Sequence, residues 1–232
     1  MKLGLLLASS PERPELAAAS QLATDSLCAG EEVYLYLIDD GVGTLDRPEI
    51  DHLRKKGVKL HVCAYGARKR HIPWDSEKAI FSGLAALADI ICGCDRFLAF
   101  TPFGRSPETT VHRSFGSLPR TLITITQDPR ESHYPAEAIR IGAGIGGWRK
   151  TEVNFLLHGP ASRILAPDAS QWVDGENYEH YLPIIHEWKR PFYLAPDAEK
   201  NAELRESGMD CRWCDAAALQ ELTQAAACRI LL

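Results

Sequence analysis

The sequence predicts an α/β protein built from two tandem copies of one small domain, each with a parallel sheet and helices on both faces. Short apolar runs of β-forming residues alternate with amphipathic segments of helical period. The same order of segments occurs twice along the chain. The 232 residues, 45% of them hydrophobic and 25% charged, are enough for one or two domains with packed cores.

The first copy begins with an apolar strand and a Pro-containing loop, and its Ala-rich first helix is predicted to stop at Gly30. Ser82 is the predicted N-cap of the last helix. Asp39-Asp40-Gly41 is predicted to form a turn after a strand, because Asp and Gly favour turns. The expected strands are Leu3–Leu7, Val33–Ile38, Val58–Cys63 and Arg96–Phe100, and the expected helices are Leu16–Leu27, Glu49–Lys56 and Ser82–Ile91.

The second copy repeats this order, with Gly146-Gly147 as the predicted helix stop and Asp215 as the predicted cap of the last helix. Its expected strands are Leu122–Ile125, Val153–Leu157, Pro191–Leu194 and Arg229–Leu232, and its expected helices are Ala136–Ile145, Tyr178–Glu187 and Asp215–Ala226. The Pro- and Gly-containing segment 101–119 is predicted to be a linker. We therefore expect domains at residues 1–100 and 120–232.

Composition and charge exclude several classes of function. The net charge of −5 and the lack of a long basic run argue against nucleic-acid binding. The N-terminal apolar stretch Leu3–Ala8 is too short for a signal-peptide core, and no apolar stretch is long enough to span a membrane. Seven cysteines without framework spacing indicate a reducing compartment. We expect a cytoplasmic protein.

Cys63 is the first candidate for chemistry, because sites in open parallel sheets form at the carboxyl ends of strands. Arg68, Lys69, Arg70 and His71 follow it closely. Their positive charge would lower the pKa of the thiol and favour the nucleophilic thiolate, and His71 is the candidate to tune it. From spacing alone, the alternative stays open that Cys63 is a buried, inert core cysteine.

Four stretches carry a resemblance to a known family: LGLLLASSPE, VYLYLIDDGV, GVKLHVCAYGARKRHI and LAALADIICGCDRFLAF. They resemble the DsrE/DsrF/TusD family of intracellular sulfur-relay proteins over nearly all of residues 1–100. Residues 120–232 resemble the family only by architecture and by the repeat. The predicted fold is thus two tandem DsrE-like domains.

The resemblance implies that Cys63 carries sulfur as a persulfide between donor and acceptor proteins, without an organic cofactor or a metal. Arg68 and Arg70 would stabilise the anionic sulfur or attract an acidic partner. In the second copy Leu194 or Ala195 stands where Cys63 would be, which suggests a structural partner. Because members of the family assemble, we expect a homo-oligomer, either a trimer or a dimer.

Two other functions remain open. One is a non-catalytic scaffold or binding protein of the same fold. The other is a dithiol oxidoreductase that uses Cys211 and Cys214, a Cys-x-x-Cys pair just before a capped helix. A metal site would need two further ligands near this pair. No glycine motif for a dinucleotide or nucleotide phosphate is present.

Overall fold

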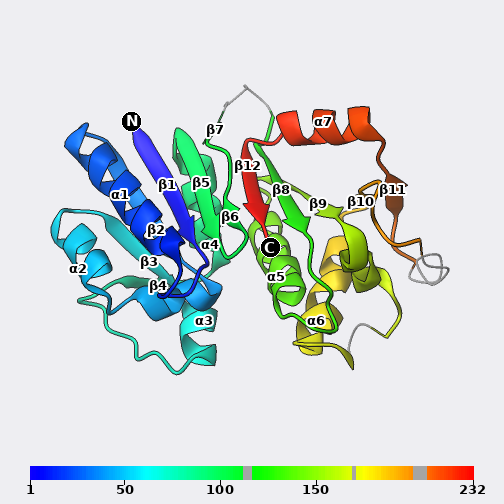
Figure 1. The fold of residues 1–232 in the computed structure, drawn as a ribbon, viewed down its shortest axis with the longest axis horizontal. Coiled ribbons are helices and arrows are strands. Elements are labelled where there is room, and N and C mark those ends of the chain that lie inside the picture. Colours follow the sequence, from blue (N-terminus) through cyan, green and yellow to red (C-terminus); the bar gives the residue numbers. More distant parts are fainter. Residues whose placement is uncertain (112–116, 169–170, 201–207) are drawn as a thin grey trace. The chain divides into compact units, whose positions relative to one another are not determined.

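The computed structural model describes residues 1–111, 117–168, 171–200 and 208–232. The chain divides into two compact units, Met1–Ser117 and Leu118–Leu232 (Figure 1). Each unit has its own sheet and its own buried core, so each is described by itself.

The first unit contains one sheet with strand order β4-β3-β2-β1-β5-β6, and β7 also pairs with β5. The strands β1 to β5 are parallel, whereas β6 and β7 run antiparallel to β5. Figure 1 shows α1 in front of this sheet and α4 behind it. The elements are β1 (Lys2–Leu7), α1 (Pro14–Cys28), β2 (Glu32–Leu37), η1 (Asp39–Thr44), α2 (Pro48–Lys55), β3 (Lys59–Cys63), α3 (Ala64–Lys69), β4 (Ile80–Ser82), α4 (Leu84–Gly93), β5 (Arg96–Thr101), β6 (Gly104–Arg105) and β7 (Thr109–Thr110).

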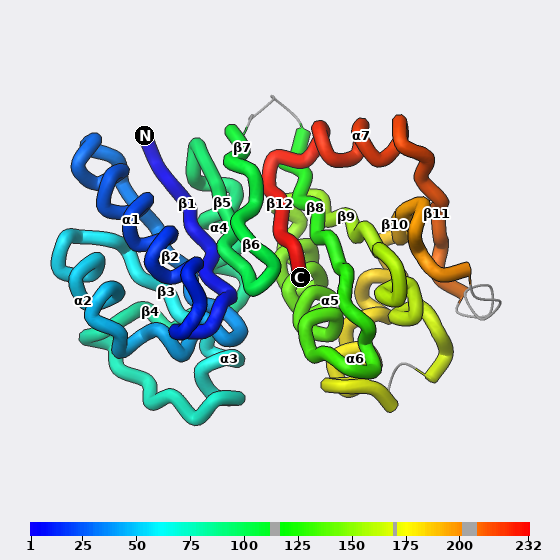
Figure 2. The backbone as a smooth tube through the Cα atoms, viewed as in Figure 1, coloured from blue at the N-terminus to red at the C-terminus, as the bar shows by residue number. Residues whose placement is uncertain are grey.

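The second unit contains a parallel sheet with strand order β11-β10-β9-β8-β12. This is the order of the five parallel strands of the first unit, and the trace in Figure 2 can be followed through both sheets. The predicted α/β fold with parallel sheets is therefore confirmed, and the shared strand order supports the predicted repeat. The elements are β8 (Arg120–Ile125), α5 (Tyr134–Gly146), β9 (Glu152–Leu157), η2 (Gly159–Leu165), α6 (Gly175–His186), β10 (Phe192–Leu194), β11 (Cys211–Trp213), α7 (Ala216–Gln224) and β12 (Cys228–Leu231).

Strand register tells which residues of the two units are equivalent. Leu37 at the end of β2 pairs with Val62 in β3, and Leu157 at the end of β9 pairs with Leu194 in β10. Val62 and Leu194 therefore match. Of the two residues that the sequence offered for the place of Cys63, the register selects Ala195.

The caps agree with the sequence in part. The Asp215 carboxylate accepts a hydrogen bond from the backbone N–H of Ala218 at 2.8 Å, as predicted for an N-cap. The prediction that Ser82 caps α4 is wrong: Ser82 ends the edge strand β4, and Gly83 takes the cap position without a side-chain bond. Gly30 has a left-handed φ of 79°, as a helix stop requires, whereas Gly147 stays right-handed at −59°.

The segment suggested as a linker contributes to the first sheet. Both β6 and β7 lie within residues 101–119, and both pair with β5. The side chain of Ser106 strengthens this pairing by accepting a hydrogen bond from the backbone N–H of Ala99 at 2.8 Å. The first unit therefore extends beyond residue 100.

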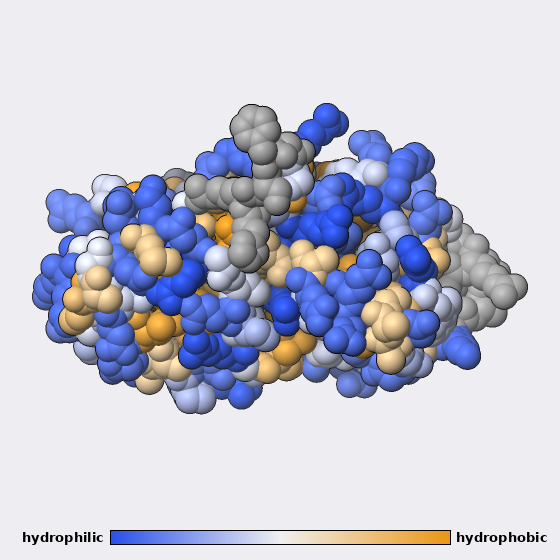
Figure 3. Space-filling model, turned by 90° about the horizontal axis from the view of Figure 1, so that it is seen from above, coloured by the Kyte–Doolittle hydropathy of each residue, from blue (hydrophilic) through white to orange (hydrophobic). Residues whose placement is uncertain are grey.

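Figure 3 shows hydrophilic residues over most of the visible surface, with apolar residues in small groups. Large apolar side chains that remain exposed include Trp74, Trp148 and Trp213. Within the described ranges, no helix combines the length and the apolar character needed to cross a membrane.

Candidate thiol site

Cys63 lies where β3 ends and α3 begins, and it is the N-cap residue of this short helix. Its Sγ accepts a hydrogen bond from the backbone N–H of Gly66 at 3.4 Å. The residue is 1% exposed. The hydrogen bond directs a backbone donor of α3 at the sulfur.

Two glycines allow the close packing around Cys63. A Cβ at Gly66 would lie 3.7 Å from the Cβ of Cys63, 3.6 Å from the backbone nitrogen of Asp39 and 3.2 Å from a methyl carbon of Val42. A Cβ at Gly41 would lie 2.0 Å from the carbonyl oxygen of Leu7, so close that only glycine fits at this position. The sequence thus permits α3, η1 and the end of β1 to meet beside the thiol.

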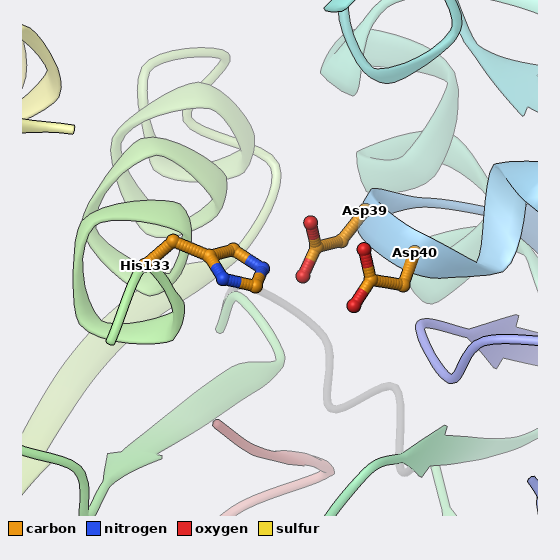
Figure 4. Close-up of side chains that lie close together, drawn as sticks. All are labelled: Asp39, Asp40 and His133. Carbon is orange, nitrogen blue, oxygen red and sulfur yellow. The ribbon is translucent and has the colours of Figure 1, made fainter. Parts of the chain in front are cut away.

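An acidic pair at the start of η1 binds Arg70. Figure 4 shows the side chains of Asp39 and Asp40 next to each other. Asp39 is 2% exposed and adopts a left-handed φ of 51°. The Arg70 guanidinium donates to Asp39, and to Asp40 at 2.7 Å. Burial opposes the charge of Arg70, but the two carboxylates outweigh it and the pKa of Arg70 is raised. This ion pair ties the end of α3 to η1.

The other cationic residues of the predicted site are exposed, Arg68 on α3 and His71 two residues beyond the end of α3. The Arg68 guanidinium lies 5.8 Å from the centre of the Tyr65 ring. His71 is exposed and has a left-handed φ of 55°. Of the three supporting residues named from the sequence, Arg70 is the one that binds the acidic pair beside Gly66.

Three polar residues outside the predicted thiol site share a sheet face with Cys63. His61 lies two residues before Cys63 on β3, and Ser82 on β4 pairs in register with Cys63. The Ser82 hydroxyl is 3.5 Å from Nδ1 of His61. The Tyr36 ring stacks on His61 with centroids 6.3 Å apart, and its hydroxyl donates to the carbonyl of Gly83 at 3.1 Å. Burial lowers the pKa of His61, which favours the neutral ring.

Because side chains alternate between the two faces of a sheet, the sequence alone could have placed His61 on the same face as Cys63. Tyr36 is placed beside His61 by the pairing of β2 with β3. Ser82 depends on β4, a strand of three residues that has too little pattern to be predicted from sequence.

The Cys-x-x-Cys pair has a different geometry from a dithiol site. Cys211 begins β11 and Cys214 follows it, so the two Cα atoms are roughly 10 Å apart along an extended chain. A disulfide needs a Cα separation of about 4.4–6.8 Å. Burial and then Asp210 raise the pKa of Cys211, and burial raises the pKa of Cys214. The arrangement weighs against the dithiol alternative.

The second unit lacks the acidic pair as well as the thiol. The backbone N–H of Ile38 donates to Leu7, and that of His158 donates to Ile125, so the two turns start at matching residues. Gly159 therefore occupies the place of Asp39, and Pro160 occupies the place of Asp40. Gly159 has a φ of 47°, close to the 51° of Asp39.

The first unit is thus an α/β domain whose main strands are parallel, with a cysteine held at the carboxyl end of β3, next to the edge strand β4. Residues 1–100 match the model of the DsrE/DsrF-like family. This match includes Cys63 and is consistent with a role in sulfur relay. The likeness of the second unit rests on its strand order and register. A search of curated proteins found no match to the chain.

Proposed function

We propose that the protein is a sulfur carrier, in which Cys63 holds sulfane sulfur as a persulfide between a donor and an acceptor thiol. The observation that carries this proposal is the position of Cys63. Its sulfur caps α3 at the carboxyl end of β3, within the residues that match a sulfur-relay family.

The transfer is an exchange reaction that needs no separate oxidant. The Cys63 thiolate attacks the outer sulfur of a donor persulfide, R–S–SH. The donor's S–S bond breaks, R–S⁻ leaves, and Cys63–S–SH forms. An acceptor thiolate then attacks the outer sulfur of Cys63–S–SH, which regenerates the Cys63 thiolate. A polysulfide donor reacts in the same way.

Each neighbouring group has a proposed role in this exchange. The N–H of Gly66 stabilises the charge on the Cys63 sulfur, both as the attacking and as the leaving group. The bond from Arg70 to the acidic pair holds α3 in place, so that this N–H stays directed at the sulfur. Arg68 on α3 and His71 just beyond it are exposed and would attract an acidic donor or acceptor protein.

The same proposal includes the cellular compartment, the partners and the assembly of the protein. A reduced thiol that exchanges sulfur requires a reducing compartment, so we place the chain in the cytoplasm. Its partners are sulfur-donor and sulfur-acceptor proteins. The second unit, with Ala195 in the place of Cys63, acts as a structural partner and contributes to a homo-oligomer.

Mass spectrometry after exposure to polysulfide tests the carrier function. The intact chain is expected to gain ~32 Da per sulfur atom, with the added sulfur located on Cys63. Cys63→Ser should lose this gain, while Cys28→Ser, which removes an exposed thiol, should keep it. Equal sulfur uptake by Cys63→Ser and the parent protein would overturn the proposal.

A second candidate is a non-catalytic binding protein, which the 1% exposure of Cys63 favours. Alkylation separates the two candidates. A carrier requires Cys63 to react faster than the exposed Cys28, because its sulfur is polarised by the Gly66 N–H. A Cys63 that resists both alkylation and polysulfide would support the binding protein.

A further inference from the structure

The second unit has a pocket of about 380 Å³ between α7 and one face of its sheet. Asn154, Tyr193 and Arg212 line it from three adjacent strands, and Cys214 lines it from the end of β11. Leu222 of α7 lies on the opposite wall. The pocket is large enough for a small organic molecule.

The pocket exists because α7 covers the sheet incompletely. The helix α4, which occupies the same place in the first unit, has four buried residues, Leu87, Ala88, Ile90 and Ile91. None of the residues of α7 is buried. Leu219 and Leu222 pack on a small apolar cluster around Leu156 and Ala195, and the rest of this sheet face stays open.

Positive charge predominates along the pocket. Arg120 and Arg190 share the single carboxylate of Glu152, at 3.3 and 2.9 Å. These arginines hold the pKa of Glu152 below its usual range. Arg212 is exposed and forms no ion pair with any residue that the structure describes. Glu221 of α7 is the other carboxylate in the lining, so the five charged groups leave an excess of positive charge.

The thiol of Cys214 lies beside the place that Cys63 would occupy. Leu194 pairs with Trp213, so the next residues, Ala195 and Cys214, are neighbours on adjacent strands. In the first unit the matching neighbours are Cys63 and Ser82. The second unit therefore carries its thiol one strand away, inside the pocket, where Cys214 is 5% exposed. The charge of Arg212 acts on this thiol and opposes the effect of burial on its pKa.

We propose that this pocket binds a small acidic thiol compound of the kind that glutathione represents, with a carboxylate at Arg212 and the sulfur beside Cys214. The excess positive charge favours an anionic ligand, and the carboxylate of Glu221 forms an ion pair with the ammonium group of the ligand. Tyr193 and Asn154 offer a hydroxyl and an amide for its peptide groups. The pocket acts independently of Cys63, so the proposal goes beyond the sulfur-carrier function.

Glutathione disulfide, the oxidised form of the ligand, can reveal binding beside Cys214 because it can form a covalent bond to this thiol. Cys214 attacks one sulfur of glutathione disulfide and forms a mixed disulfide, and reduced glutathione leaves with the thiol proton. Glutathione disulfide is the oxidant in this exchange. Because burial raises the pKa of Cys214, the reaction should become faster as the pH rises toward the pKa of the thiol.

Titration of the full chain with reduced glutathione tests the proposal, with tryptophan fluorescence and calorimetry as readouts. Arg212→Ala should weaken binding at least about tenfold, the loss expected for one charge-assisted contact. Arg13→Ala removes an exposed arginine of the first unit and should leave binding unchanged. Cys214→Ser should keep the reversible binding and lose the mixed disulfide that mass spectrometry locates on Cys214.

Three results would overturn the proposal: no binding at millimolar glutathione, equal binding by Arg212→Ala and the parent, or a mixed disulfide that forms as fast on the exposed Cys28 as on Cys214. Cys63→Ser separates this proposal from the carrier function. If the parent protein binds glutathione but takes up no sulfur, only the carrier function is refuted. Sulfur uptake on Cys63 without glutathione binding would refute the pocket alone.

Discussion

Replacement of Arg70 by Met tests whether the acidic pair holds α3 and the thiol in place. The substitution keeps much of the side-chain length but removes the guanidinium that binds the carboxylate of Asp39, which is 2% exposed. Loss of one partner from a fully buried ion pair costs about 3–5 kcal/mol. Because the Arg70 side chain keeps 24% of its exposure, we expect a smaller loss of unfolding free energy, about 2–3 kcal/mol.

Urea unfolding measures this loss, and hydrogen exchange of peptides from η1 and α3 locates it. Exchange in both elements should accelerate, since Arg70 joins them. Arg68→Met is the matched control, because Arg68 is exposed on the same helix, and it should change the free energy by less than about 0.5 kcal/mol.

The double variant Asp39→Asn/Arg70→Met separates charge from shape. Asn tolerates the left-handed backbone of Asp39 and removes the charge that Arg70 balances in the parent protein. It should therefore recover part of the stability that Arg70→Met loses, and it should restore slow exchange in α3. Equal stability of Arg70→Met and Arg68→Met would refute the reasoning.

Three further predictions concern His61, Gly41 and the expected oligomer. Since burial lowers the pKa of His61 in the folded state, the unfolded chain binds more protons, and stability should fall as the pH drops below ~6.5; in His61→Gln this contribution to the pH dependence of urea unfolding should be absent. Gly41→Ala places a Cβ 2.0 Å from the carbonyl oxygen of Leu7 and should lower the melting temperature clearly, whereas Gly93→Ala, with open space around it, should not. Light scattering should give a mass well above the 25.7 kDa of one chain, and a monodisperse monomer at micromolar concentration would contradict the expected oligomer.

Periodicity was sufficient to predict the long elements. Strands such as Lys2–Leu7 are buried along nearly their whole length, and helices such as Pro14–Cys28 are long enough to show an apolar stripe. The short elements α3, β4 and β11 have three to six residues and show no such pattern. Their positions depend on pairing and packing that involve distant parts of the chain.

The candidate site shows the same limit. Proximity in sequence grouped Arg68, Arg70 and His71 with Cys63, but Arg70 binds Asp39, which is 31 residues away. This pairing depends on where β2 and β3 end relative to each other, and no local signal encodes that register. Asp39-Asp40-Gly41 was predicted as a turn from its composition, yet its two carboxylates also bind the helix that Cys63 begins.

Comparison of the two units supports the view that the acidic pair belongs to the thiol site and is not needed for the fold. The turn after β9 keeps the left-handed residue of the turn after β2, but it uses Gly159, which adopts this conformation without strain. Asp39 adopts it at a cost that its bonds to Arg70 offset. The unit that has Ala195 in place of Cys63 has neither carboxylate. If the pair served only the fold, the second unit, which has the same strand order, would be expected to need it too. The ion pair therefore accompanies Cys63, as expected if it positions the helix whose N–H contacts the sulfur.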